Sequence, residues 1–167
     1  MTSEQAEKLE TLVTQDMRDR QGVWGEERVA PPVSLSDIRK WGIAVYWPEK
    51  PPQLFWDEEY AKTTRWGGIV APSEFNPFAW PLEREIAAGR ATAQGAGVGT
   101  RGMNGGQVET FGVPIRPGDV ITSRTRLKEW NERSTRLGLT LFSFTETEWL
   151  NQNGEHVKTR ISTGIRY

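Results

Sequence analysis

The chain has 167 residues, with 21 basic and 22 acidic side chains and a formal net charge of -1, so its charge does not indicate a nucleic-acid-binding protein. Cysteine is absent, which excludes disulfides, thiol nucleophiles and thiolate metal sites. The length suits one domain over residues 1–167. No apolar run is long enough to span a membrane, and the polar N-terminus does not resemble a signal peptide. We therefore expect a cytoplasmic protein.

The numbers of histidines and tryptophans further limit the kinds of functional site that the chain can form. The single histidine, His156, excludes a multi-histidine metal site within the chain, and its position after Asn153 and Gly154 is typical of an exposed turn residue. Eight tryptophans are heavy usage for this length. They either pack the core and interfaces, which is the ordinary role of tryptophan, or form an aromatic surface for a partner subunit or an apolar ligand.

The N-terminal part of the chain predicts two helices and a short strand. Apolar residues at helical spacing indicate a helix within residues 4–20, so that residues 1–21 form a peripheral N-terminal helix. A short strand is expected within residues 23–29. Ser34 and Asp37 then resemble a capping box, and the helix that they start should end near Tyr46 because Pro48 follows.

The stretch from residue 56 to residue 81, WDEEYAKTTRWGGIVAPSEFNPFAWP, is the one around which we expect the fold to be organised. Asp57 can cap a short acidic helix, and Gly67 and Gly68 then make a turn. Pro72 suits the first position of a central buried helix, although later prolines prevent that helix from being long and regular. The aromatic residues that follow Pro72 are Phe75, Phe78 and Trp80.

Residues 83–89 predict a short helical tail, and a glycine-rich stretch follows at residues 91–106. This stretch lacks the Lys-Ser/Thr ending of a P-loop and does not follow a clear strand, so a phosphate-binding loop is not favoured. A connection, or a lid at the edge of a ligand site, fits its composition better.

The C-terminal third changes to a strand pattern. Alternating apolar residues and turn signals indicate three or four antiparallel strands, which with the helical first half gives an α+β protein with helices on one face of a sheet. The expected strands are residues 106–115, 120–127, 137–150 and 156–167, with turns at 116–119, 131–134 and 151–154.

Three segments resemble a known family: WDEEYAKTTRWGGIVAP, NGGQVETFGVPIRPGDVITSRTRL and NQNGEHVKTRISTGIRY. They resemble the FAS1-like dehydratase domain of the MaoC-like hydratase superfamily, which has the hotdog fold. The resemblance implies a strongly curved antiparallel sheet wrapped around a central helix, here beginning near Pro72, and two hotdog units associated through their sheets. It also implies a CoA or carrier-protein thioester as substrate, no bound cofactor, and hydration of a trans-2-enoyl thioester to the (R)-3-hydroxyacyl product.

The resemblance also locates the catalytic motif, and this sequence departs from it. The family's acid–base pair is an Asp and a His in a motif that falls just before Glu58 here. The His position holds Phe55, the Asp position holds Lys50, and Pro51-Pro52-Gln53 replaces the Asn-Pro part. Phenylalanine cannot transfer a proton, which leaves Glu49 as a lone candidate base.

We therefore expect a non-catalytic, pocket-shaping subunit of a heteromeric (R)-specific 2-enoyl-CoA hydratase for bulky acyl-CoA thioesters, with steroid side chains or long chains as candidates. A second hotdog subunit, in a heterodimer or heterotetramer, would carry the catalytic Asp and His. One alternative is a homo-oligomeric acyl-thioester binding protein without chemistry. Another is a hotdog thioesterase that uses Glu74, although stabilising a helix N-terminus is the plainer role for this residue.

Candidate substrate-binding residues follow from the resemblance and from side-chain chemistry. Backbone amides at Gly67 and Gly68 could face a carbonyl oxygen, or these glycines simply make a turn. Arg116, with Arg124 and Arg126, suits CoA phosphates, but a solvated strand face is the plainer explanation for each of these arginines. The full set of candidates is Gly67, Gly68, Phe75, Trp80, Asn104, Gly105, Gly106, Gln107 and Arg116. No metal site is expected.

Overall fold

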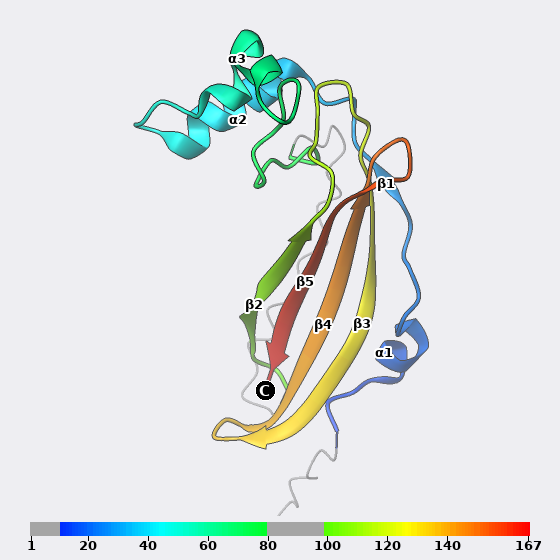
Figure 1. Cartoon of the computed structure of the whole chain (residues 1–167). Helices are drawn as coiled ribbons and strands as arrows, with labels where there is room; N and C mark the ends of the chain where they lie inside the picture. Colours follow the sequence, from blue (N-terminus) through cyan, green and yellow to red (C-terminus); the bar gives the residue numbers. More distant parts are fainter. Residues whose placement is uncertain (1–10, 80–98) are drawn as a thin grey trace, which may run out of the picture.

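A computed structural model of the protein describes residues 11–79 and 99–167 (Figure 1). In these residues the dominant element is a curved five-stranded sheet in the order β1-β3-β4-β5-β2, in which every neighbouring pair is antiparallel. Figure 1 shows α2 and α3 gathered at one end of the sheet and α1 beside β3. The strands are β1 (Arg28–Val29), β2 (Gly102–Phe111), β3 (Thr122–Thr135), β4 (Gly138–Leu150) and β5 (His156–Arg166), and the helices are α1 (Gln15–Arg20), α2 (Leu35–Tyr46), the 3-10 turn η1 (Gln53–Phe55) and α3 (Glu58–Thr63).

The helix starts predicted from capping residues are confirmed. The Ser34 hydroxyl accepts a hydrogen bond from the Asp37 backbone N–H at 3.0 Å, and the Asp57 carboxylate accepts one from the Tyr60 N–H at 3.0 Å. Each bond satisfies one of the first-turn amides that a helix leaves without an intrahelical partner. The N-terminal helix is shorter than expected, because α1 begins only at Gln15 and residues 1–10 lie outside the described residues.

The predicted turn at residues 131–134 is wrong. β3 runs through this stretch to Thr135, with Asn131 opposite Phe142 and Ser134 opposite Leu139. The chain reverses instead at Arg136 and Leu137, between Thr135 and its partner Gly138, whose φ of 94° is a conformation that glycine adopts without strain. Local turn preference at Asn131 and Ser134 is therefore outweighed by continued pairing with β4. The next turn, at residues 151–154, is confirmed: the Asn151 side-chain oxygen accepts from the backbone N–H groups of Asn153 and Glu155.

The central helix expected from Pro72 has not begun by Ala79. Residues 72–79 form two successive turns, in which Phe75 N–H donates to Pro72 O at 2.9 Å and Ala79 N–H donates to Asn76 O at 3.1 Å. Pro77 interrupts any regular helix here, since it has no N–H and its ring obstructs the preceding turn. The predicted helical tail at residues 83–89, Trp80 and residues 91–98 of the glycine-rich stretch lie outside the described residues.

Most of the buried apolar side chains gather at the end of the sheet where α2 and α3 lie. Ile38 of α2 and Ile121, next to β3, belong to the same buried cluster and are both 0% exposed, so this cluster holds α2 against the sheet. Backbone hydrogen bonds reinforce it, with Ala30 N–H donating to Ile121 O and Ala71 N–H donating to Ile115 O, each at 2.8 Å. A second, smaller cluster of Leu12, Met17 and Leu141 secures the region of α1.

A ladder of ion pairs spans β3 and β4. Arg124 pairs with Glu148 and Arg126 with Glu146, each at 2.6 Å, and the ring of Trp24 lies over both guanidinium groups. Burial acts to raise the pKa of Glu146, but Arg126 and Lys128 outweigh it and hold that pKa below its usual value. The ionised carboxylate therefore stabilises the sheet above the normal pKa of glutamate and loses this effect as the pH falls through the lowered value.

Glu146→Gln is expected to reduce the free energy of unfolding by about 1–2 kcal/mol at neutral pH, because Arg126 loses a charged partner in a partly buried position. The deficit relative to wild type should shrink as the pH falls through the lowered pKa of Glu146, because the wild-type carboxylate is then itself protonated. Urea denaturation at several pH values measures this. Glu59→Gln, which removes an exposed pair with Lys62, is the matched control and should change little. An equal loss in both variants would contradict the role given to Glu146.

Candidate functional site

The positions that the resemblance assigns to the acid–base pair, Lys50 and Phe55, hold packing side chains. Phe55 closes η1, is half-buried, and its ring centroid lies 6.0 Å from that of Tyr46. The Lys50 ammonium lies 4.4 Å from the ring centroid of Trp56, and Glu49 is exposed. His156, the only histidine of the sequence, lies at the start of β5, half-buried rather than in an exposed turn, and shares a 2.8 Å hydrogen bond with Thr159. Positions 49, 50 and 55 thus form no proton-transfer pair with it.

Hydrogen bonds fix the loop that carries these positions. The Trp56 indole N–H donates to Pro51 O at 3.0 Å, and the Arg39 guanidinium of α2 donates to Trp56 O through Nε at 3.2 Å and Nη2 at 2.9 Å. Arg39 also pairs with Glu58 at the start of α3, at 3.2 Å. The loop is therefore tied to both helices, as expected of a segment that forms a fixed wall.

Three of the predicted substrate-binding residues come together although they are about 50 positions apart in sequence. The Arg116 guanidinium donates to Trp66 O at 2.8 Å, immediately before Gly67, and its Nη1 would lie 3.8 Å from a Cβ placed on Gly68. Gly67 has a φ of 65°, so the turn requires glycine or a residue of similar freedom. Asp119 in turn accepts a hydrogen bond from the Arg116 N–H, which confirms the turn predicted at residues 116–119.

A cavity of about 590 Å³ opens between α2, residues 31–33 and residues 75–77. Phe75, predicted as a substrate-binding residue, lines it together with Trp41, whose ring meets that of Phe75 edge-on at 5.6 Å. The Trp41 Nε1 atom is buried and has no hydrogen-bond partner among the described residues. The lining is Pro31, Pro32, Val33, Asp37, Lys40, Trp41, Ala44, Phe75, Asn76 and Pro77. The sequence analysis did not predict the α2 residues of this wall as ligand-binding. The helical spacing of Asp37, Trp41 and Ala44, which places them on one side of the helix, was the only sequence feature that could have indicated it.

The remaining candidates lie elsewhere. Asn104, Gly105, Gly106 and Gln107 form a bulge in β2, where the Asn104 side chain accepts from the Gly106 N–H at 2.8 Å, and all four are exposed. Glu74 is exposed and accepts from the Ser73 hydroxyl at 2.8 Å. Arg124 and Arg126 are engaged by Glu148 and Glu146, so their charges are already balanced within the chain.

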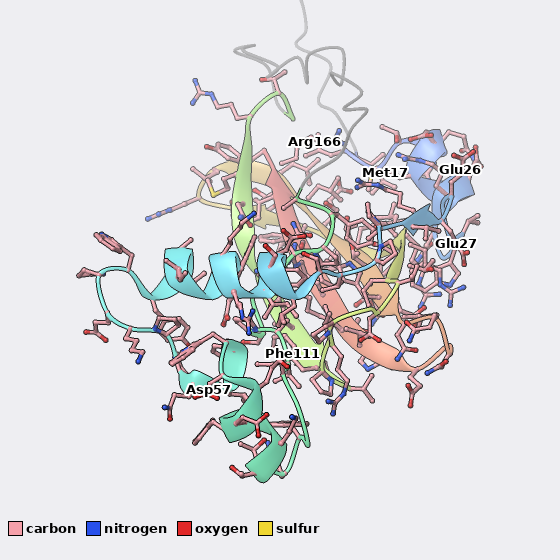
Figure 2. All side chains as sticks on the ribbon, turned by 90° about the horizontal axis from the view of Figure 1, so that it is seen from above. Met17, Glu26, Glu27, Asp57, Phe111 and Arg166 are labelled. Carbon is pink, nitrogen blue, oxygen red and sulfur yellow. The ribbon has the colours of Figure 1, made fainter. Side chains whose placement is uncertain are left out.

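The strand β2 occupies one edge of the sheet, with β5 on its inner side and no described strand on its outer side. Its large apolar side chains remain open: Val108 is 68% exposed, Phe111 52% and Met103 45%. β2 ends at Phe111, at the end of the sheet nearer α2 and α3 (Figure 1), and Figure 2 labels this side chain in a view from that end. An apolar edge strand of this kind is a surface to which another strand can pair.

Residues 20–160 match the family model described as the FAS1-like dehydratase domain region. The chain belongs to this family. No curated protein sequence matches it. Among residues 11–79 and 99–167 no group of three or more metal-ligating side chains occurs, and no helix of these residues is long and apolar enough to cross a membrane.

Solved structures establish the fold. The MaoC-like dehydratase from Rhodospirillum rubrum is 19% identical, with a TM-score of 0.56 over 86% of this chain and 91% of that chain. The ChsH1-ChsH2 complex from Mycobacterium tuberculosis is 15% identical, with a TM-score of 0.66 over 91% of each chain. The truncated HadBC (3R-hydroxyacyl-ACP dehydratase) complex from the same organism is 19% identical, with a TM-score of 0.54 over 84% and 96%. The hotdog fold of the α+β class, expected from the sequence, is confirmed.

Arg116→Ala is expected to loosen the turn at Gly67 and Gly68, because Trp66 O loses its charged donor. We expect the free energy of unfolding to fall by about 1–2 kcal/mol and amide hydrogen exchange at residues 66–69 to accelerate. Arg136→Ala, in the exposed β3–β4 turn, is the matched control. Unchanged exchange at residues 66–69 in Arg116→Ala would show that Arg116 does not hold the turn.

Proposed function

We propose that this protein is the non-catalytic, pocket-shaping subunit of a heteromeric (R)-specific 2-enoyl-CoA hydratase acting on bulky acyl-CoA thioesters. The proposal rests on which side chains occupy the positions assigned to the acid–base pair. Phe55 packs against Tyr46 and Lys50 lies over Trp56, in a family whose fold this chain has and whose proton-transfer pair it lacks. Since addition of water needs a group that deprotonates it and a group that returns a proton, another chain has to supply both.

Two of the similar structures favour a partner of the same fold. The ChsH1-ChsH2 and HadBC structures are each complexes of two named chains, and HadBC is a 3R-hydroxyacyl-ACP dehydratase. For this chain, the open β2 edge with Val108, Phe111 and Met103 is the surface at which we place the partner. Covering these side chains would remove a large apolar area from water and would hide an edge that otherwise invites aggregation.

The cavity beside α2 suits the acyl part of the substrate. Its volume of about 590 Å³ lies within the range of about 300–1,000 Å³ that is usual for ligand sites. Half of its lining is proline and aromatic residues, Val33 and Ala44 add apolar surface, and Asp37, Lys40 and Asn76 are its polar members. Such walls fit a bulky apolar group such as a ring system or a long chain. Arg116, beside the glycine turn, is the residue we place nearest the CoA phosphates, because a guanidinium matches phosphate geometry.

The test is hydration of trans-2-octenoyl-CoA by the purified chain alone and after co-expression with a hotdog chain that carries an intact Asp/His pair and co-purifies with it. We expect no rate above background for the chain alone and a clear rate for the complex, followed by the loss of the enoyl-thioester absorbance. Replacing the partner's Asp should abolish the rate, and Glu49→Gln should leave it unchanged. Hydration by the chain alone, lost in Glu49→Gln, would overturn the proposal.

Val108→Glu is expected to weaken the complex roughly tenfold or more, because a carboxylate would be moved from water into an apolar contact at the β2 edge. Analytical ultracentrifugation of the complex and the melting temperature of the isolated chain separate assembly from folding. Leu137→Glu is the matched control, since Leu137 is similarly exposed but lies in the β3–β4 turn. Equal assembly of the two variants would exclude the β2 edge as the interface.

A further inference from the structure

Lys158 on β5 is a buried lysine that belongs neither to the family's catalytic motif nor to the residues used in the proposed function. Lys158 is only 4% exposed. It lies opposite Trp149 of β4 and Phe111 of β2, so the three side chains share one face of the sheet. The Lys158 ammonium lies 4.1 Å from the ring centroid of Trp149 and 5.8 Å from that of Phe111. These rings position the charge between them by cation–π attraction.

Among residues 11–79 and 99–167, the ammonium of Lys158 has few partners for its degree of burial. Its ion pair is with Glu109 Oε1 at 3.8 Å, which is beyond hydrogen-bonding distance, and the same oxygen accepts a 2.7 Å hydrogen bond from Arg160 Nε. A lysine ammonium has three N–H donors, and leaving them unpaired away from water costs free energy. Among the described residues, the side-chain nitrogens that are both unpaired and sealed from solvent are Trp41 Nε1 and Arg166 Nε, so the tip of Lys158 keeps an opening.

The groups around Lys158 indicate what kind of acceptor fits that opening. Burial lowers the pKa of Lys158 and Arg160 acts in the same direction, whereas the carboxylates of Glu109 and Glu74 oppose them. Two cations and two carboxylates therefore balance, so a neutral oxygen is favoured over a phosphate. Glu74 directly precedes Phe75 of the cavity wall, and Phe111 lies on the open β2 edge. Lys158 is not part of the cavity lining, but it is within reach of one residue next to the cavity and of one on the proposed interface.

We propose that Lys158 donates a hydrogen bond to the thioester carbonyl oxygen of the bound acyl-CoA. This assignment rests on the proposed function and adds a substrate-binding residue to it. When water adds to the β carbon, electron density moves from the C=C bond onto the carbonyl oxygen, and a fixed ammonium in a poorly solvated position stabilises that charge. The proton that the water loses goes through the partner's pair to the α carbon, while Lys158 keeps its own proton.

The contribution of the carbonyl oxygen is measurable with two ligands. Isothermal titration of the assembled complex compares octanoyl-CoA, which has no C=C bond to hydrate, with S-octyl-CoA, a thioether that differs from it only in lacking the carbonyl. Wild type should bind the thioester about tenfold more tightly than the thioether, because only the thioester can accept a hydrogen bond from the charged donor. Lys158→Met should lose this preference and lower kcat of the complex. Lys128→Met, whose ammonium pairs with Glu146 at 3.5 Å, is the matched control and should keep the preference.

The outcomes distinguish the two proposals. A thioester preference that persists in Lys158→Met overturns the assignment of Lys158 alone, whereas a wild-type complex that binds neither ligand overturns the proposed function and this assignment with it. Lys158→Met is expected to fold at least as stably as wild type, since it removes an under-bonded buried charge. If Lys158→Met fails to fold, Lys158→Gln is titrated instead, because it keeps N–H donors without the charge. Its preference for the thioester over the thioether should be smaller than that of wild type. An undiminished preference would contradict the assignment of Lys158.

Discussion

The packing of α2 and of residues 69–75 against one end of the sheet is the constraint on which the other features depend. Ile38 and Ile121 belong to the cluster buried there and have no exposed surface, and backbone bonds to residues 30 and 71 hold the flanking segments in place. Because this end is fixed, α2 becomes one wall of the cavity and Arg39 can hold the loop that carries Phe55. The cavity is thus a consequence of how the core closes.

Packing and proton transfer compete for the same loop. A proton-transferring side chain has to keep a polar tip free, whereas Phe55 contributes only apolar surface to the core end of the sheet. Lys50 likewise lies over Trp56, whose indole N–H and backbone carbonyl are both engaged. A loop arranged in this way gains rigidity and apolar contact. It therefore suits a wall of a shared pocket better than a catalytic position.

How far the sequence predicts this structure depends on the range of the interactions involved. The helix caps at Ser34 and Asp57 and the turn at residues 151–154 are contacts between near neighbours in the chain, and they were predicted. The length of β3 depends on pairing with β4, and local turn preference at residues 131–134 did not reveal it. At the site, the sequence suggested Gly67, Gly68 and Arg116 separately but could not show that they meet. The burial of Lys158 depends on register across three strands, so it has no local signal at all.

The row formed by Trp149, Lys158 and Phe111 connects the strand register with the proposed site and the open β2 edge. Antiparallel register places the three side chains side by side, the rings hold the ammonium, and the open β2 edge leaves one ring half exposed. A buried cation that is incompletely paired is costly in an isolated chain and becomes useful when a ligand or a second subunit completes its surroundings. The division of labour that we propose follows: this chain supplies the pocket and a fixed hydrogen-bond donor, and its partner supplies the groups that move protons.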